Sequence, residues 1–312
     1  MHFAVAGIDV APWVPPLVAF CISFFTSMGG ISGAFLLLPF QMSFLGYTNP
    51  SVSATNQLFN IVAIPSGVYR YIREGRMVWP LTWVVIVGTL PGVFLGAIAR
   101  VRWLPDPRNF KMFAGLVLLY IGLRMVRDLT CRKGDKAAAE KRFQELVAAH
   151  RKRAKETCEP LPTTRVLAWN LRHVSYEFYG ERFTVSSPGI FLLSLVVGVV
   201  GGVYGIGGGS IIAPFFVSVF GLPIYTVAGA ALMGTFVTSV FGVAFYQAIA
   251  PFYPHMSVAP DWSLGLLFGA GGMLGMYLGA RCQKFVPARA IKWGLAAVIV
   301  YTAAKYVVGW LF

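Results

Sequence analysis

Residues 189–220 read GIFLLSLVVGVVGGVYGIGGGSIIAPFFVSVF, an apolar run with a dense cluster of glycines near its middle. The run belongs to a stretch of 78 residues, 183–260, that contains no Asp, Glu, Lys or Arg; a second such stretch, 10–69, has 60 residues. One helix that crosses a bilayer needs only about 20 apolar residues. We therefore predict an all-α polytopic membrane protein.

The composition agrees with this prediction. The chain is 57% hydrophobic and 12% charged, whereas a soluble domain carries roughly 25% charged residues. The net charge of +14 would in a soluble protein suggest nucleic acid, but the charges are confined to intervals between apolar runs. We expect a lipid bilayer as partner and no nucleic acid. The N-terminus shows no cleavage pattern, so the first apolar segment is expected to remain.

The apolar runs divide into ten predicted helical segments. They are 11–28, 31–45, 54–69, 78–99 and 112–126 in the first part, and 189–205, 210–220, 228–247, 262–280 and 293–312 in the second. The second and the seventh contain Pro39 and Pro214, and at 1.5 Å per residue they are too short to cross about 30 Å. We predict short or re-entrant helices there, which are tolerated where they face protein or a water-filled cavity.

The chain contains an internal repeat. Residues match at shifts of 175, 183 and 181 along the chain, and the matched pairs include Gly30 and Gly205, Pro39 and Pro214, Trp79 and Trp262, Lys111 and Lys292, and Arg124 and Lys305. Five segments per half is an odd number, so the second half is predicted to insert upside down. Inverted-topology repeats are typical of secondary transporters. We expect a first membrane repeat at 1–128, a basic interval at 129–188 and a second membrane repeat at 189–312.

The distribution of positive charge predicts the orientation. Residues 127–188 carry 13 basic and 8 acidic residues, so this interval is expected in the cytoplasm. The N-terminus and the uncharged connection 250–259 then fall outside. The interval that holds Arg100, Arg102 and Arg108 also falls outside, as an exception to the rule.

The basic interval has structure of its own in our prediction. Residues 135–156 are rich in Ala, Glu, Lys and Arg and form an amphipathic pattern, which indicates a solvated helix beside the bilayer. A soluble partner held through 135–156 is the alternative, and a homo-oligomer is also left open. Residues 176–187 alternate in polarity and suggest a small β-hairpin.

The glycine cluster Gly205-Ile-Gly-Gly-Gly-Ser210 is the sharpest motif. Glycines that break a helix leave N–H groups free at the start of the next one, where an anion can bind; close helix packing is the alternative. The repeat places Gly29-Gly30-Ile31-Ser32-Gly33 at the matching position, so we expect the two breaks to converge. The predicted substrate-binding residues from the breaks are Gly29, Gly30, Ser32, Gly33, Gly207, Gly208, Gly209 and Ser210.

Uncharged polar side chains extend this predicted site. Asn56 and Asn60 are one helical turn apart, and Thr235 and Ser239 hold the related positions of the second half. Amides and hydroxyls can replace the water around a small oxyanion, although hydrogen bonds between helices are the alternative role. Gln57 lies beside this face and is a weaker candidate.

Embedded charges are almost absent from the sequence. All 12 acidic residues lie in loops or at segment ends, and no segment holds clustered His, Asp or Glu. We therefore predict no catalytic residue, no metal site, no cofactor and no carboxylate relay. Arg124 and Lys305 lie near segment ends, where basic side chains snorkel to the interface or alternatively attract an anion.

The pattern resembles the sulfite exporter TauE/SafE family, also called toluene-sulfonate uptake permeases. The resemblance rests on the glycine break and proline of 205–214, the turn Gly221-Leu222-Pro223, the helix 228–238 and the glycine-rich segment 265–280. The first half departs from the motif, because Gly-Gly-Ile-Ser-Gly replaces the full glycine run. The resemblance implies movement of sulfite, sulfonates or related organosulfur anions across a bacterial inner membrane.

Our hypothesis is a secondary transporter of small anions that alternates access by rocking of its two halves. A non-transporting membrane anchor or assembly subunit that uses 135–156 is one alternative, and an anion channel is another. An intramembrane enzyme is disfavoured, because no acid, base or nucleophile is embedded in the apolar segments.

Overall fold

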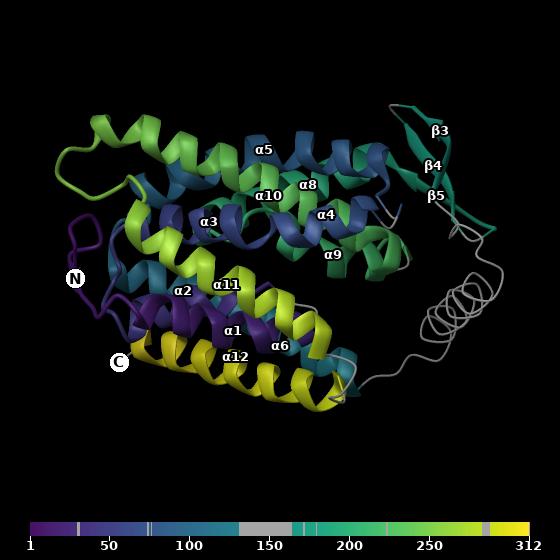
Figure 1. Cartoon of the computed structure of the whole chain (residues 1–312). Coiled ribbons are helices and arrows are strands. Elements are labelled where there is room, and N and C mark those ends of the chain that lie inside the picture. The colour runs from purple at the N-terminus through teal and green to yellow at the C-terminus, as the bar shows by residue number, and fades with distance from the viewer. Residues whose placement is uncertain are drawn as a thin grey trace.

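The computed structural model describes residues 1–29, 32–73, 75, 77–130, 164–170, 172–178, 180–222, 224–282 and 288–311. Within these residues, six helices are long and apolar enough to cross a membrane. The long helices run along one common direction, with both termini at one end of the molecule and a small β-sheet at the other (Figure 1). The predicted all-α polytopic fold is confirmed.

The helices follow the predicted segments closely. The first half holds α1 (Val14–Gly29), α2 (Ala34–Ser43), α3 (Ser51–Ala63), α4 (Pro65–Arg73), α5 (Trp79–Arg102) and α6 (Pro107–Thr130). The second half holds α8 (Ser187–Tyr204), α9 (Gly209–Ser218), α10 (Ile224–Ile249), the 3₁₀ turn η1 (Ala250–Phe252), α11 (Trp262–Cys282) and α12 (Ala288–Leu311). The predicted segment 54–69 is wrong in one respect: it is divided between α3 and α4, because Pro65 has no N–H to continue the helical hydrogen bonds.

Five short strands complete the described structure. β1 (His2–Phe3) and β2 (Ile8–Asp9) form a small hairpin. β3 (Arg165–Trp169), β4 (His173–Phe178) and β5 (Glu181–Ser186) form an antiparallel sheet. The hairpin predicted at 176–187 is thus present with an additional strand, and the helix predicted at 135–156 lies outside the described residues. The hydroxyls of Tyr176 and Thr226 are 2.8 Å apart, which joins the sheet to α10, and burial raises the pKa of Tyr176.

Two short helices turn back at mid-depth. α2 and α9 have 10 residues each, so they extend about 15 Å, half of a bilayer core. A methyl group placed on Gly208 would lie 2.6 Å from Cγ2 of Thr89, near the middle of α5. In the first half, a methyl group placed on Gly33 would lie 3.4 Å from Cζ of Phe59. A methyl group on Gly272, near the middle of α11, would meet the same ring. The turns of the hairpins α1–α2 and α8–α9 therefore lie halfway along the spanning helices.

Two rows of glycines bring helices of opposite halves into close contact. A methyl group on Gly92 of α5 would lie 2.3 Å from the carbonyl oxygen of Leu195 in α8, and one on Gly275 of α11 would lie 2.3 Å from that of Phe20 in α1. We call these rows the glycine ladders; they consist of Gly88, Gly92 and Gly96 on α5, and of Gly271, Gly275 and Gly279 on α11. Each hairpin therefore packs against a helix from the other half of the chain.

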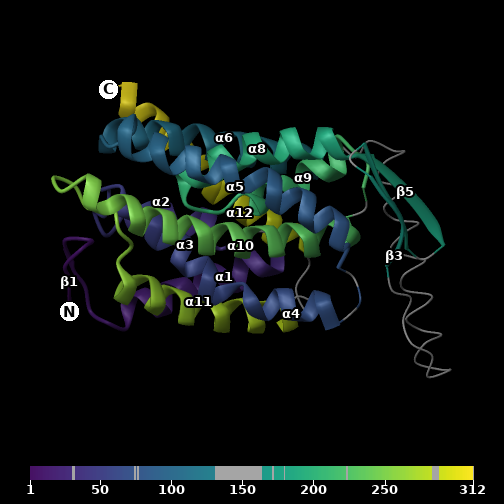
Figure 2. The ribbon, with the colours of Figure 1, turned by 90° about the horizontal axis from the view of Figure 1, so that it is seen from above.

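The middle of the molecule is occupied by α3, which packs against α2, α10 and α11 (Figure 2). Every residue from Ser51 to Asn60 is buried. A helix that is buried on all sides yet carries serine, threonine, asparagine and glutamine must satisfy those groups internally. This helix therefore positions the candidate site.

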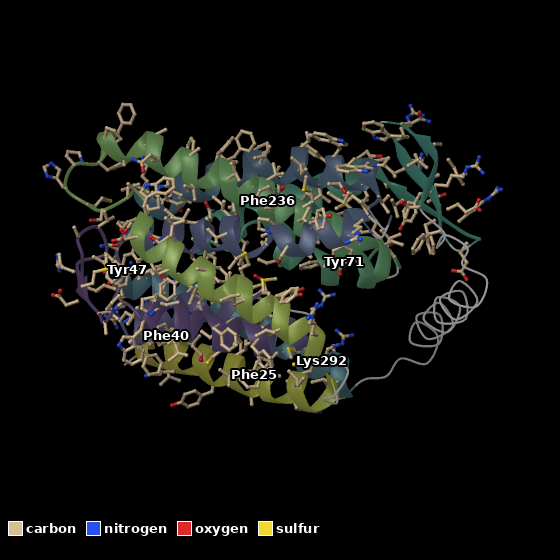
Figure 3. The ribbon with its side chains drawn as sticks, viewed as in Figure 1. Phe25, Phe40, Tyr47, Tyr71, Phe236 and Lys292 are labelled. Atoms are coloured by element: carbon tan, nitrogen blue, oxygen red, sulfur yellow. The ribbon has the colours of Figure 1, made fainter. Side chains whose placement is uncertain are left out.

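The loops between the helices lie at two opposite ends of the molecule. The end of α4, the start of α5 and the β-sheet lie at one end, whereas the N-terminus and η1 lie at the other (Figure 1). Tyr71 and Lys292 mark the sheet end and Tyr47 marks the opposite end in Figure 3. The assignment of these ends to cytoplasm and exterior stays a prediction.

Arg100 corrects the prediction of an exposed outer loop charge. α5 extends to Arg102, and Arg100 on its last turns is fully buried. Its guanidinium donates to the carbonyl oxygens of Leu104 and Thr48 and lies 3.6 Å from the ring centroid of Phe110. The positive-inside rule concerns charges near the membrane surface, so Arg100 is a structural cation and does not belong in that count.

Candidate functional site

The break between α8 and α9 is built from left-handed glycines. Gly205 and Gly207 have φ angles of 81° and 71°, a region that favours glycine. A methyl group on Gly205 would lie 2.3 Å from the carbonyl oxygen of Ser53, so α3 approaches the break closely. The break requires glycine for both its backbone conformation and its proximity to α3.

Side chains of α3 satisfy the carbonyl groups that the break leaves free. Asn56 Nδ2 donates to Gly205 O at 3.1 Å, and Asn60 Nδ2 donates to Ile206 O at 3.1 Å. Ser53 Oγ donates to Val203 O at 2.8 Å. The last carbonyls of a helix have no partner within it; here α3 of the other half supplies the partners.

The same amide reaches the first break. Asn56 Nδ2 also donates to Ala34 O at 3.2 Å, at the start of α2. Tyr204, the last residue of α8, donates its hydroxyl to Phe35 O at 3.0 Å. Of the predicted residues here, Gly29 ends α1, Ser32 Oγ accepts from Ala34 N at 3.4 Å, and Gly30 lies outside the described residues. The two breaks therefore meet at α3.

Helix α10 closes the other side of the second break. A methyl group on Gly207 would lie 3.0 Å from Ser239 Oγ, and one on Gly209 would lie 2.6 Å from Thr235 Oγ1. Asn60 Nδ2 is 3.5 Å from Ser239 Oγ. The structure therefore brings these predicted residues together, while Gly208 faces Thr89 of α5 instead. Ser210 lies in the first turn of α9.

The cluster is sealed from the surface. Asn56, Asn60 and Ser239 have no exposed area and Thr235 is 1% exposed. Both N–H directions of the Asn56 amide point at backbone carbonyls. The cluster is therefore closed to solvent in this structure, and Asn56 joins the two breaks.

Several buried polar atoms around α3 have no partner among the described residues. They are Gln57 Oε1 and Nε2, Asn60 Oδ1, Gln41 Oε1 and Ser23 Oγ. Unpaired buried polar atoms are rare in native proteins and mark places for water or a ligand. Gln57, the weaker candidate from the sequence, forms one polar stripe at helical spacing with Ser53, Asn56 and Asn60, and both of its polar atoms are among those without a partner.

The N-termini of α2 and α9 add positive potential to this centre. Their N-caps, Gly33 and Gly208, have no side chain that could cap the helix, and at α2 the hydroxyl of Ser32 accepts from the first N–H, that of Ala34. α2 starts beside Asn56 and ends at Ser43 near Tyr306, whereas α9 runs towards the sheet end (Figure 1). Both positive helix ends therefore lie at mid-depth, where they favour an anion. Within the described residues, no group of three or more His, Cys, Asp or Glu could hold a metal ion.

Spanning helices, two helix breaks at mid-depth and a neutral polar centre define a multi-pass membrane transporter. The family model described as Sulfite exporter TauE/SafE matches residues 16–306, nearly the whole chain. The chain belongs to this family. The comparisons with curated proteins and with solved structures gave no match.

Proposed function

We propose that the protein is a secondary transporter of small anions, with sulfite, sulfonates or related organosulfur anions as substrates, across a bacterial inner membrane. The observation that carries this proposal is the meeting of the N-termini of α2 and α9 with neutral amides and hydroxyls at mid-depth. Helix dipoles and amides can hold an anion without neutralising it, which leaves it free to depart. Membership of the TauE/SafE family supports the substrate class.

The inverted repeat is part of the proposal, and the packing of the helices supports it. Under the repeat, α1 corresponds to α8 and α11 corresponds to α5. The pairs that pack are α1 with α11 and α8 with α5, so each pair becomes the other when the halves are exchanged. The pairs α3 with α10 and α6 with α12 also pack, and each joins two corresponding helices.

The same packing suggests which bodies move. Rocking of the two sequence halves as units would open both glycine ladders, where the helix backbones approach each other closely. We propose instead that α5, α8 and α10 move as one body against α1, α3 and α11. The bonds from Asn56 and Asn60 to Gly205 and Ile206 lie on this boundary, so their opening frees two amides for substrate.

Flux through the purified protein in liposomes tests the function. Sulfite and a panel of sulfonates are offered on one side, with and without a pH gradient, and uptake is measured against concentration. We expect saturable flux that Asn60→Leu reduces at least tenfold, whereas Gln247→Leu, an amide exposed on α10, leaves it unchanged. Absence of flux for every anion would overturn the substrate class, and flux that never saturates would indicate a channel.

Deletion of residues 135–156 separates transport from anchoring. A transporter built around α3 keeps its flux when this segment is removed. A membrane anchor or assembly subunit that uses the segment loses its function on deletion, yet tolerates substitution at the glycine breaks.

A further inference from the structure

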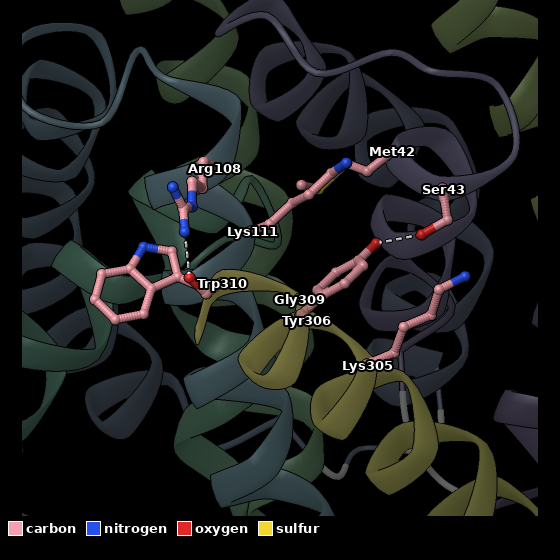
Figure 4. Close-up of a pocket in the computed structure, with 8 residues that line it drawn as sticks. All are labelled: Met42, Ser43, Arg108, Lys111, Lys305, Tyr306, Gly309 and Trp310. Atoms are coloured by element: carbon pink, nitrogen blue, oxygen red, sulfur yellow. Dashed lines mark hydrogen bonds between the residues drawn. The ribbon is translucent and has the colours of Figure 1, made fainter. Parts of the chain in front are cut away.

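A pocket separate from the central site opens at the end of the molecule that carries both termini. It has a volume of about 250 Å³ and lies between the end of α2, the start of α6 and the end of α12 (Figure 4). Its polar lining consists of Ser43, Arg108, Lys111, Lys305, Tyr306 and Trp310. A water molecule occupies about 30 Å³ of liquid, so the cavity has room for a sulfonate or phosphate group.

The lining is positively charged. Arg108 and Lys111 come from α6 and Lys305 comes from α12, while no acidic residue is among the described residues that line the cavity. Neither lysine forms a hydrogen bond or an ion pair with any residue in the described part of the chain. Like charges around one cavity repel each other, and because Arg108 and Lys305 are exposed, water and salt screen part of this repulsion. An anion in the pocket would remove this repulsion.

The walls of the pocket are held in place by other contacts. Arg108 Nη2 donates to Trp310 O at 2.6 Å, which fixes the arginine against the end of α12. The Tyr306 hydroxyl donates to Pro39 O at 3.2 Å and is 2.7 Å from Ser43 Oγ. The two lysines are therefore the adjustable groups of an otherwise fixed cavity, the arrangement that a ligand needs.

Ordinary snorkelling does not account for these positions. Snorkelling requires only that each cation reach water at its own helix end, and it gives no reason for three cations to share one cavity. The repeat adds a second observation: Arg108, Lys111 and Lys305 match Arg289, Lys292 and Arg124 at the shift of 181. Basic residues therefore recur at both ends of the α6–α12 pair, including the end predicted to lie outside.

We propose that the pocket between α2, α6 and α12 binds a small oxyanion of the sulfonate or phosphate type. The cations attract it, and the fixed rings of Tyr306 and Trp310 form part of the wall. The group belongs either to an anion in solution or to the headgroup of an anionic lipid. This site is distinct from the central one and does not depend on the proposed transport.

The first arm of the test uses anions in solution. The full-length protein is purified in detergent, stripped of lipid and titrated with p-toluenesulfonate, sulfite and phosphate by calorimetry. Each substitution removes one charge-assisted hydrogen bond to the anion, so we expect Lys111→Gln and Lys305→Gln each to raise Kd about tenfold or more. Arg102→Gln is the matched control, because Arg102 is an exposed cation near the same end that does not line the pocket. Binding that survives Asn60→Leu but not the lysine changes belongs to the pocket.

The second arm uses lipid. The protein is extracted from membranes that contain phosphatidylglycerol, and the lipid retained is counted by native mass spectrometry. Loss of retained phosphatidylglycerol in Lys111→Gln/Lys305→Gln, with retention in Arg102→Gln, assigns the site to a headgroup. The proposal is overturned if the double variant has the same Kd for the anions and retains the same amount of phosphatidylglycerol as Arg102→Gln, with an unchanged melting temperature. That result would say nothing against transport through the central site.

Discussion

Nδ2 of Asn56 lies 3.1 Å from the carbonyl oxygen of Gly205, and this bond ties the buried helix of the first half to the helix break of the second. The same nitrogen lies 3.2 Å from Ala34 O. One amide therefore holds both breaks in the closed conformation. Its contribution can be separated into a structural part and a transport part by substitution.

Asn56→Ala should lower stability, because two buried carbonyls lose their donor. Each unsatisfied group costs about 1–3 kcal/mol, and Asn56→Asp should cost more, since a carboxylate oxygen would face both carbonyl oxygens. The measurement is the melting temperature in detergent, with Gln247→Ala as the exposed amide control. An Asn56→Asp protein that melts like the wild type would show that these bonds do not hold the breaks.

Gln57→Leu should separate stability from transport. The substitution removes two buried polar atoms that have no partner among the described residues and keeps the volume, so we expect a stability gain of about 1–3 kcal/mol together with a loss of flux. A Gln57→Leu protein with full flux would exclude Gln57 from the pathway.

Gly242 of α10 lies beside Gln57, and substitutions at both positions test this contact. A methyl group on Gly242 would lie 2.1 Å from Gln57 Oε1, so Gly242→Ala alone should destabilise the protein by about 1–3 kcal/mol through overpacking. In the Gln57→Ala background the same methyl fills vacated space. We expect a double-mutant cycle on the free energy of unfolding to give a favourable coupling between the two substitutions. Additive effects would show that residues 57 and 242 do not contact each other.

Gly209→Ala should be among the most damaging glycine changes. The added methyl would lie 1.9 Å from the carbonyl oxygen of Ala231, and backbone cannot yield as a side chain can. We expect a lower melting temperature and no flux. Gly294→Ala on α12, where a methyl meets nothing within 4 Å, should melt like the wild type or slightly higher. Equal behaviour of the two variants would contradict the packing at the second break.

Arg100→Gln should destabilise the protein, whereas Arg102→Gln should not. Arg100 is buried and donates to two loop carbonyls, while Arg102 is exposed. Loss of charge-assisted bonds costs about 1.5–3 kcal/mol each, against less than about 0.5 kcal/mol for an exposed site. Thermal unfolding of both variants checks this. Equal melting temperatures would indicate that Arg100 is exposed like Arg102 and does not stabilise the fold.

The sequence predicted the helices well and the contacts between them less well. Apolar runs, glycines and prolines locate α2 and α9 as short helices, because length and composition are properties of one segment. The burial of Arg100 depends on Thr48, which belongs to another segment, so spacing alone does not predict it. Asn56 and Asn60 were predicted from their shared helical face, and Gln57 was ranked lower because it lies beside that face. Its close approach to Gly242 of α10 joins two segments, so spacing along one helix does not predict it.

Accessibility of engineered cysteines should reveal the sidedness. Phe252 in η1 is 80% exposed and Trp169 in β3 is 58% exposed. β3 and the connection between α10 and α11, which contains η1, lie at opposite ends of the molecule (Figure 1). In a variant without the native cysteines, we expect an impermeant maleimide added to spheroplasts to label Phe252→Cys and not Trp169→Cys. The reverse pattern would invert the predicted orientation, and labelling of both would contradict it.

The exchanged glycine ladders have a consequence for how the protein is made. The helix that covers α1 is α11, and Gly271 reaches Pro16 only after about 250 further residues have been synthesised, which takes tens of seconds at about 5–20 residues per second. Until then the α1–α2 hairpin has α3 as a neighbour, but the face of α1 that α11 covers in the complete structure has no partner from the second half. We therefore expect the insertion machinery, or other helices of the first half, to cover this face of α1 until α11 is inserted.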